Sequence, residues 1–232
     1  MSLAHSPQVV TSGLVLVVDA ANTRSYPGTG TAWYDLSGNS NTGTLVSSPT
    51  YSTNNNGTLV FNGTNQNINI TDSTSLQVAD TFTISAWVYA TNLSGRYGIF
   101  STRYDNTAGC WQLEIGIANG GTGRVAVTGV GTWIWESVDS VVTSNTWYNV
   151  CFVKTNNATV GGSMYLNSTS LTPLQTTAYT IINNSSVKTI GNGTANSQFF
   201  PGNISNVMLY NRTLSADEIT QNFNAIRGRF GL

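Results

Sequence analysis

The chain has 232 residues and a formal net charge of −1 at pH 7, and only 8% of its residues are charged. This length suits one large all-β domain or two small ones. Lysine and arginine form no run, so the clustered cations that bind nucleic acid are missing. No apolar run reaches the ~20 residues that span a bilayer. We therefore expect neither nucleic acid nor a membrane as a partner.

The N-terminal part predicts an extended arm followed by a strand. We expect residues 1–12 to form the arm and residues 13–232 to form a single domain, because no linker or change in composition divides the chain. The apolar run Leu14–Asp19 is typical of a central strand that is covered on both faces. It is a poor signal peptide, because it is short and lacks a basic flank. We therefore expect synthesis in a cytoplasm.

Residues 22–41 predict a long loop, because they are rich in Pro, Gly, Ser and Asn. Its aromatic residues are Tyr26, Trp33 and Tyr34, and we expect their rings to attach the loop to the body of the domain.

Short apolar or alternating runs, separated by turn residues, predict further strands. These are residues 43–46, 59–61, 66–71, 82–89, 97–101, 111–117, 124–128, 132–136, 147–154, 163–167, 187–190 and 204–210. In the run 82–89, alternation places Phe82, Ile84, Ala86 and Val88 on one face, and Trp87 and Tyr89 on the other. The spacing of roughly 8–15 residues between strands is typical of a two-sheet sandwich.

The C-terminal segment predicts one short α-helix. Ser215 and Glu218 have the spacing of a capping box. An apolar stripe with helical spacing follows, and Gly228 predicts the end of the helix. The fold class is therefore all-β, with two antiparallel sheets and one short C-terminal helix.

Cys110 and Cys151 are the two cysteines of the chain. Their spacing does not decide whether they form a disulfide. We favour two buried free thiols, because both lie in strand-like segments beside aromatic residues.

The order of several motifs carries a resemblance that runs from about Gly13 to the C-terminus. These motifs are Gly13–Leu16 with Asp19, Trp33–Asn39, Phe61–Asn65, Ile84–Val88, Trp147–Val150 and Gly202–Ile219. Together they resemble the concanavalin A-like jelly roll, in its laminin-G-like and pentraxin-like branch. The resemblance implies a two-sheet antiparallel jelly-roll sandwich.

The two ends of the chain look like those of a subgroup found in tailed bacteriophages. The segments concerned are Ala4–Pro7 and Asn222–Gly231. This similarity implies a virion surface structural protein, made in the host cytoplasm, that decorates a capsid or forms the head of a fibre. We then expect a homo-oligomer, in a virion context a trimer, in contact with other virion proteins.

Calcium is the usual ion of this family, and oxygen atoms hold it. The resemblance makes Asp19, together with backbone carbonyls near Gly63, the candidate site. Positions that are often acidic in relatives are Asn62, Ser205 and Asn206 here. We therefore expect a weak or empty calcium site.

Aromatic side chains are the candidates for contacting a carbohydrate or a protein partner. Alternation places Trp133 and Trp135 on one face of their strand, and Tyr104, Asp105 and Trp111 could lie nearby. Such residues could stack on sugars of a host-surface polysaccharide. The alternative is that they pack within the sheet or between subunits.

Acidic residues do not predict a catalytic pair. A glycosidase needs two carboxylates about 5–9.5 Å apart. Glu114 stands alone on its strand, and Glu136 and Asp139 would face opposite sides of an extended strand. His5, the one histidine, lies in the arm without companions for a triad or a metal site. We expect a non-enzymatic protein, with a carbohydrate-binding adhesin and a divergent glycoside hydrolase as the alternatives.

Overall fold

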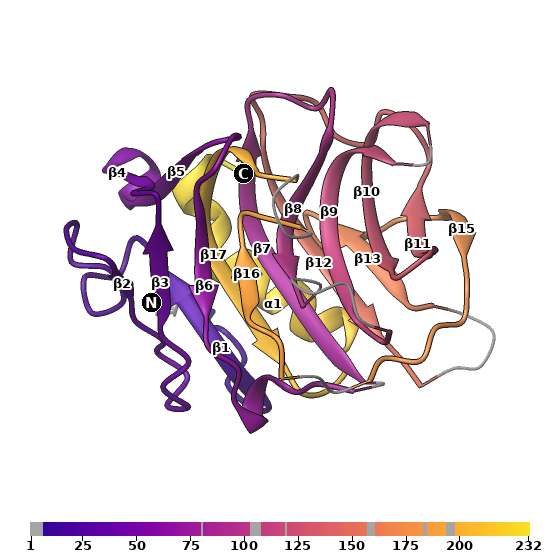
Figure 1. Cartoon of the computed structure of the whole chain (residues 1–232), viewed down its shortest axis with the longest axis horizontal. Coiled ribbons are helices and arrows are strands. Elements are labelled where there is room, and N and C mark those ends of the chain that lie inside the picture. Colours follow the sequence, from indigo (N-terminus) through magenta and orange to yellow (C-terminus); the bar gives the residue numbers. More distant parts are fainter. Residues whose placement is uncertain are drawn as a thin grey trace, which may run out of the picture.

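The computed structural model describes residues 7–79, 81–102, 108–118, 120–156, 161–182, 185–193 and 198–232. Two antiparallel sheets pack face to face, and a short C-terminal helix lies against one of them (Figure 1). The predicted all-β, two-sheet jelly-roll sandwich with one C-terminal helix is confirmed.

One sheet has eight strands in the order β14-β13-β12-β7-β17-β5-β4, and β1 pairs with β17 beside this path. Its strands are β1 (Leu14–Asp19), β4 (Thr50–Ser52), β5 (Thr58–Asn62), β7 (Phe82–Ala90), β12 (Trp147–Lys154), β13 (Ser163–Leu166), β14 (Thr169–Ser170) and β17 (Pro201–Tyr210).

The other sheet has nine strands in the order β15-β11-β10-β9-β8-β16-β6-β3-β2. Its strands are β2 (Ala32–Trp33), β3 (Gly43–Val46), β6 (Asn67–Ile70), β8 (Arg96–Ser101), β9 (Trp111–Ala118), β10 (Gly121–Gly129), β11 (Thr132–Ser137), β15 (Pro173–Thr176) and β16 (Lys188–Ile190). Short 3₁₀ turns η1 (Asn54–Asn56) and η2 (Thr74–Leu76) flank β5 and β6.

The main core lies between the two sheets, and β7 shows how its residues are divided. Phe82, Ile84, Ala86 and Val88 belong to this core, as the alternation predicts. Trp87 belongs instead to a second apolar cluster on the outer side of the eight-stranded sheet. Both sides of this sheet are therefore covered by apolar side chains.

The second cluster is where helix α1 (Ala216–Ile226) packs. The capping box of Ser215 and Glu218 is present at its start, and Ile219 and Ile226 are buried against the sheet. Helix α1 ends at Ile226 with Arg227 as its C-cap, directly before Gly228 as predicted, and the 3₁₀ turn η3 (Arg227–Phe230) then continues through Gly228. Gly231, with a φ of 72°, follows that turn in the left-handed conformation. In the part of the chain that the structure describes, no helix is long and apolar enough to cross a membrane.

The described part of the N-terminal arm, residues 7–12, packs on the same cluster. The backbone N–H of Val10 donates to Asn222 Oδ1 over 2.7 Å, and the Tyr210 hydroxyl donates to the Val10 carbonyl over 2.9 Å. The arm thus extends the cover that α1 forms over the eight-stranded sheet. His5 lies outside the described residues.

Three expectations about the N-terminal half and the cysteines can be compared with the structure. Strand β1 is covered on both faces, but it is not central, because β17 is its one strand partner among the described residues. Tyr26 and Trp33 are buried as predicted, whereas Tyr34 is 49% exposed and does not attach the loop. Cys110 and Cys151 are buried thiols that are not joined in a disulfide, as favoured from the sequence, and burial raises the pKa of the Cys151 thiol to about 12.

The start of α1 leads to a prediction about acid stability. Arg212 forms a two-point ion pair with Glu218 over 2.6 and 2.8 Å. This contact, together with the backbone N–H of Ser215, lowers the pKa of Glu218 from 4.5 to about 2. Because the folded pKa is depressed, the stabilisation is present above pH 4.5 and is lost as the pH falls toward 2.

We expect Glu218→Gln to flatten the dependence of the unfolding free energy on pH over this acidic range. Urea unfolding followed by fluorescence at several pH values measures the slope. Asp217→Asn is the matched control, since Asp217 occupies the same first helical turn without that ion pair. Equal slopes for the wild type and Glu218→Gln would contradict the prediction.

Candidate functional site

The hairpin of β10 and β11 separates the two tryptophans that alternation placed together. Thr128 pairs with Trp133 and Val127 pairs with Trp135, so the register shifts between these pairs. This irregularity turns Trp135 into the main core, where it is 1% exposed. Trp133 is only partly buried and lies on the outer side of the nine-stranded sheet. The prediction that both rings share a face is therefore wrong.

The other predicted contact residues do not join Trp133. Trp111 is 1% exposed and stacks on Phe82 in the core, with ring centroids 4.4 Å apart. It therefore packs inside the sandwich and is not an exposed platform. Tyr104 and Asp105 lie outside the described residues.

An ion pair lies beside Trp133 on the outer side of the nine-stranded sheet. Arg96 of β8 donates from Nη2 and Nε to the two carboxylate oxygens of Glu114 of β9, over 2.7 and 3.1 Å. Its guanidinium carbon also lies 4.7 Å from the centroid of the Trp133 ring. This distance is within the range of a cation–π contact. The salt bridge therefore fixes the arginine against the ring.

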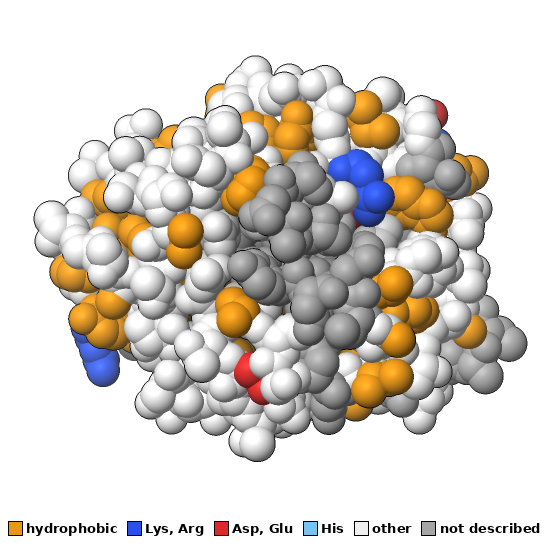
Figure 2. Space-filling view, viewed as in Figure 1, with side chains coloured by type: hydrophobic (Ala, Val, Ile, Leu, Met, Phe, Trp, Pro, Cys, Tyr) orange, Lys and Arg blue, Asp and Glu red, His pale blue; other side chains and the backbone are white. Residues whose placement is uncertain are grey.

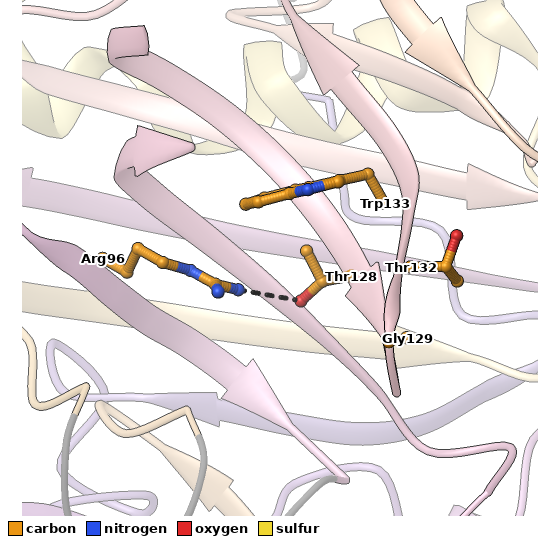
Figure 3. Close-up of a pocket in the computed structure, with 6 residues that line it drawn as sticks. Arg96, Thr128, Gly129, Thr132 and Trp133 are labelled. Atoms are coloured by element: carbon orange, nitrogen blue, oxygen red, sulfur yellow. Dashed lines mark hydrogen bonds between the residues drawn. The ribbon is translucent and has the colours of Figure 1, made fainter. Parts of the chain in front are cut away.

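Thr128 of β10 completes the row of polar groups across three neighbouring strands. Its hydroxyl lies 3.4 Å from Arg96 Nη2 and 3.3 Å from Glu114 Oε2. Figure 3 shows Arg96 extending toward Thr128, with the Trp133 ring projecting beside them from the next strand. The sequence signal for these residues is alternation, because Glu114 is flanked on β9 by the core residues Leu113 and Ile115.

A hollow of about 140 Å³ opens at this point. It is lined by Arg96, Thr128, Gly129, Gly131, Thr132 and Trp133. The turn of the hairpin supplies two glycines, so backbone groups form part of its wall. Figure 2 shows few charged side chains among the described residues of this face of the molecule, which is the face turned away from α1.

Gln112 continues the polar row next to Glu114. Its side-chain amide donates to the Glu114 carboxylate and, over 2.6 Å, to Gln198 Oε1. Gln112 Oε1 is buried and has no hydrogen-bond partner among the described residues. Such an orphaned acceptor is uncommon, since buried polar groups are nearly always hydrogen-bonded.

A second cluster of charges lies further along the same face. Arg124 of β10 contacts both Glu136 of β11 and Asp139, the latter over 2.6 Å. Asp139 lies beyond the end of β11, so strand alternation does not apply to it and the expected separation of Glu136 and Asp139 is wrong. The hydrogen bond from Arg124 lowers the pKa of Asp139 below its ordinary value.

Glu114 and Glu136 face the same side, because both are paired with Ala126 of the intervening strand. Neighbouring strands lie about 4.8 Å apart, so the backbones of these two residues are separated by about 10 Å. Each carboxylate is in contact with an arginine. The two glutamate side chains are 1% and 0% exposed, so both carboxylates are engaged in ion pairs within the sheet rather than presented to a substrate. The arrangement is suited to binding a polar ligand.

The candidate calcium residues lie apart from each other. Gly63 follows the end of β5, beside Pro201, whereas Asp19 lies near Gly57 at the opposite end of that strand. The Asp19 carboxylate accepts hydrogen bonds from Arg229 over 2.9 and 3.0 Å. Among the described residues, no group of three His, Cys, Asp or Glu is placed to hold a metal ion. The structure thus does not assemble a site from Asp19 and Gly63.

The fold and the open polar face together define a lectin-like β-sandwich. Residues 61–220 match the model of the concanavalin A-like lectin/glucanases superfamily. Because this match covers more than half of the chain, the protein belongs to that superfamily. No curated protein sequence matches this chain significantly.

Three solved structures illustrate the same fold. Domain 4 of AbnA, a GH43 extracellular arabinanase from Geobacillus stearothermophilus in complex with arabinotriose, is 15% identical with a TM-score of 0.69, over 91% of this chain and 98% of that one. The binding domain of Paraclostridial Mosquitocidal Protein 1 is 18% identical with a TM-score of 0.68, over 92% of this chain and 52% of that one. Trypanosoma rangeli sialidase in complex with sialic acid is 16% identical with a TM-score of 0.65, over 92% of this chain and 33% of that one. The chain therefore spans nearly all of the arabinanase domain, about half of the toxin domain and a third of the sialidase.

Proposed function

We propose that this protein is a non-catalytic, lectin-like domain that binds carbohydrate at the hollow beside Trp133. The observation that carries the proposal is the partly exposed Trp133 ring, held against the Arg96 guanidinium at the mouth of the hollow. Sugar-binding sites combine an aromatic surface, which packs on the C–H face of a sugar ring, with a few placed polar groups. Both parts are present here on rigid strands.

The polar groups beside Trp133 match the hydroxyls of a sugar. Arg96 uses Nε and Nη2 to hold Glu114, and its Nη1 makes no hydrogen bond to Glu114 or to any other described residue. The Arg96 side chain remains 34% exposed. An exposed guanidinium N–H can donate to a sugar oxygen. The salt bridge with Glu114 keeps the arginine in place before a ligand arrives.

The comparison with the arabinanase domain supports a sugar as the class of ligand, because that domain is solved with arabinotriose. A binding screen against arabinotriose, other neutral oligosaccharides and sialylated glycans tests the proposal. We expect saturable binding of at least one of these classes to the purified chain. The absence of binding to every glycan at millimolar concentration would contradict it.

The non-catalytic part of the proposal rests on the two arginine-held carboxylates. We expect no release of reducing sugar from any polysaccharide that the chain binds. Glu114→Gln and Glu136→Gln test this separately, because each removes one carboxylate. Hydrolysis by the wild type that disappears in either variant would contradict the proposal and support the divergent glycoside hydrolase.

The setting that we propose is the surface of a bacteriophage virion, where the chain is a decoration or fibre-head protein that also serves as a host-binding adhesin. The support is the similarity of the chain ends to phage proteins, together with the low fraction of charged residues. A surface with few charges keeps its interactions when the salt concentration changes, since salt screens charges. A homotrimer in light scattering and binding to purified virions are the expected results. A strict monomer that does not bind virions would contradict this setting.

A further inference from the structure

A second hollow lies on the opposite side of the sandwich, on the outer face of the eight-stranded sheet. It has a volume of about 230 Å³ and is lined by Asn54, Asn55, Tyr89, Trp147 and Asn203. Tyr89 of β7 pairs directly with Trp147 of β12 and with Asn203 of β17. A row of three neighbouring strands therefore forms its floor.

The two aromatic rings of the floor are held but not fully covered. Tyr89 and Trp147 are both partly exposed, and their ring centroids are 5.6 Å apart. Phe230 of η3 packs on Trp147 with a centroid distance of 4.4 Å, and on Trp87 with a distance of 4.2 Å. These contacts fix the position of Trp147 relative to the C-terminal segment.

The wall opposite the aromatic rings is the turn η1, and its backbone is also fixed. Asn55 has a φ of 53°, in the left-handed region, and its side-chain amide donates to the Arg229 carbonyl over 2.9 Å. Arg229 Nε donates back to the Asn55 carbonyl over 3.3 Å. Gly57 follows with a φ of 139°, and a Cβ there would lie 2.4 Å from the Ala20 carbonyl oxygen. The turn is therefore held to both η3 and the loop after β1.

Several hydrogen-bonding groups of the lining residues have no partner in the part of the chain that the structure describes. No described residue bonds to the Tyr89 hydroxyl, to Trp147 Nε1 or to the side-chain amide of Asn54. Asn203 donates from Nδ2 to Thr58 Oγ1 over 3.0 Å, which leaves its Oδ1 as an acceptor. The residues that line the hollow therefore offer both donors and acceptors beside two aromatic rings.

We propose that this hollow is a second carbohydrate-binding site and that it takes a neutral sugar. That the ligand is a carbohydrate rests on the proposed function of the protein. The place of the site and the neutral charge of the sugar are inferred from the residues that line the hollow. Amide and hydroxyl groups pair with sugar hydroxyls, which are both donors and acceptors. None of its described lining residues is charged. The carboxylate of an acidic sugar would lose water there without gaining a cation, which is unfavourable.

Two sites on opposite faces would allow one chain to contact two glycan strands. Linked sites raise the overall affinity for a repeating polymer without any new contact. An arginine lines the hollow beside Trp133, and no described residue that lines the second hollow is an arginine, so the two sites would differ in their preference for acidic sugars.

The indole N–H signals of the protein in ¹H–¹⁵N NMR spectra test the proposal site by site, because Trp133 and Trp147 report on different hollows. The probes are arabinotriose and cellotriose as neutral sugars and sialyllactose as the acidic one. We expect the Trp147 signal to shift with at least one neutral trisaccharide in the wild type and equally in Trp133→Ala. Tyr89→Phe should weaken the Trp147 titration by about fivefold to tenfold, the value of one hydrogen bond, and leave the Trp133 titration unchanged.

Asn54→Ala is a second test, because Asn54 is exposed and its side chain makes no described contact that would affect folding. It should weaken the same titration, whereas Asn224→Ala, an exposed asparagine on α1, should not. A Trp147 signal that stays fixed with both neutral sugars would overturn the second site, even where the Trp133 signal moves. An equal response of Trp147 to sialyllactose would overturn its neutrality. Movement of Trp147 alone would support this site and contradict the role of Trp133.

Discussion

Trp133→Ala is expected to weaken glycan binding by about tenfold to a hundredfold. Covering an aromatic side chain with an apolar surface contributes about 1.5–3 kcal/mol, and each 1.4 kcal/mol changes a dissociation constant tenfold. The alanine also removes the surface over which the Arg96 guanidinium lies. The arginine then keeps its salt bridge with Glu114 but loses its cation–π contact with the Trp133 ring. Titration calorimetry or NMR with the best glycan of the screen measures the effect.

Two controls separate this binding effect from a loss of folding. Trp133 is only partly buried, so the thermal midpoint of Trp133→Ala should stay close to that of the wild type. Tyr34→Ala removes another exposed aromatic ring, 49% exposed, that lies away from the hollow. We expect Tyr34→Ala to bind as the wild type does. Equal affinity of Trp133→Ala and the wild type would show that the hollow is not the binding site.

Trp87→Ala is expected to lower the free energy of unfolding by about 3–5 kcal/mol, as large-to-small substitutions of buried tryptophan do. Trp87 is fully buried on the outer side of the eight-stranded sheet. It stacks on Phe223 of α1 and on Phe230 of η3, with centroid distances of 5.5 and 4.2 Å. Its removal leaves a cavity beneath both C-terminal elements. Because a domain is stable by only about 5–15 kcal/mol, this is a large part of the total.

Chemical denaturation of Trp87→Ala measures this loss, with Phe223→Ala as the companion variant. Phe223 is only partly buried, so its replacement should cost less than that of Trp87. Trp87→Ala should also weaken sugar binding at the second hollow, because Phe230 packs on both Trp87 and Trp147. A typical single substitution changes the unfolding free energy by about 1 kcal/mol. If Trp87→Ala changes it by no more than this, the assigned role of Trp87 is contradicted.

The fold could be predicted because its signals are local. Alternation in residues 82–89 correctly divided the core side of β7 from its outer side. The spacing of Ser215 and Glu218 correctly marked the first turn of α1. Both signals depend only on residues that are close in sequence, so they can be recognised from one amino-acid sequence without knowledge of the fold.

The candidate site could be predicted only in part, because it depends on register between distant strands. Alternation places Trp133 and Trp135 on one face, but the shift in pairing between β10 and β11 sends Trp135 into the core. Arg96 and Glu114 are 18 residues apart and become neighbours only because β8 pairs with β9. The second hollow combines residues of η1, β7, β12 and β17, whose contacts no sequence spacing indicates. The positions of Tyr104 and Asp105 lie outside the described residues and stay predictions.

A crystal structure with the best-binding oligosaccharide tests the central claim most directly. We predict a sugar ring packed on the exposed face or edge of Trp133, with Arg96 Nη1 within hydrogen-bonding distance of a sugar oxygen. A sugar bound only at other places, with the hollow beside Trp133 empty at saturating ligand, would contradict the account.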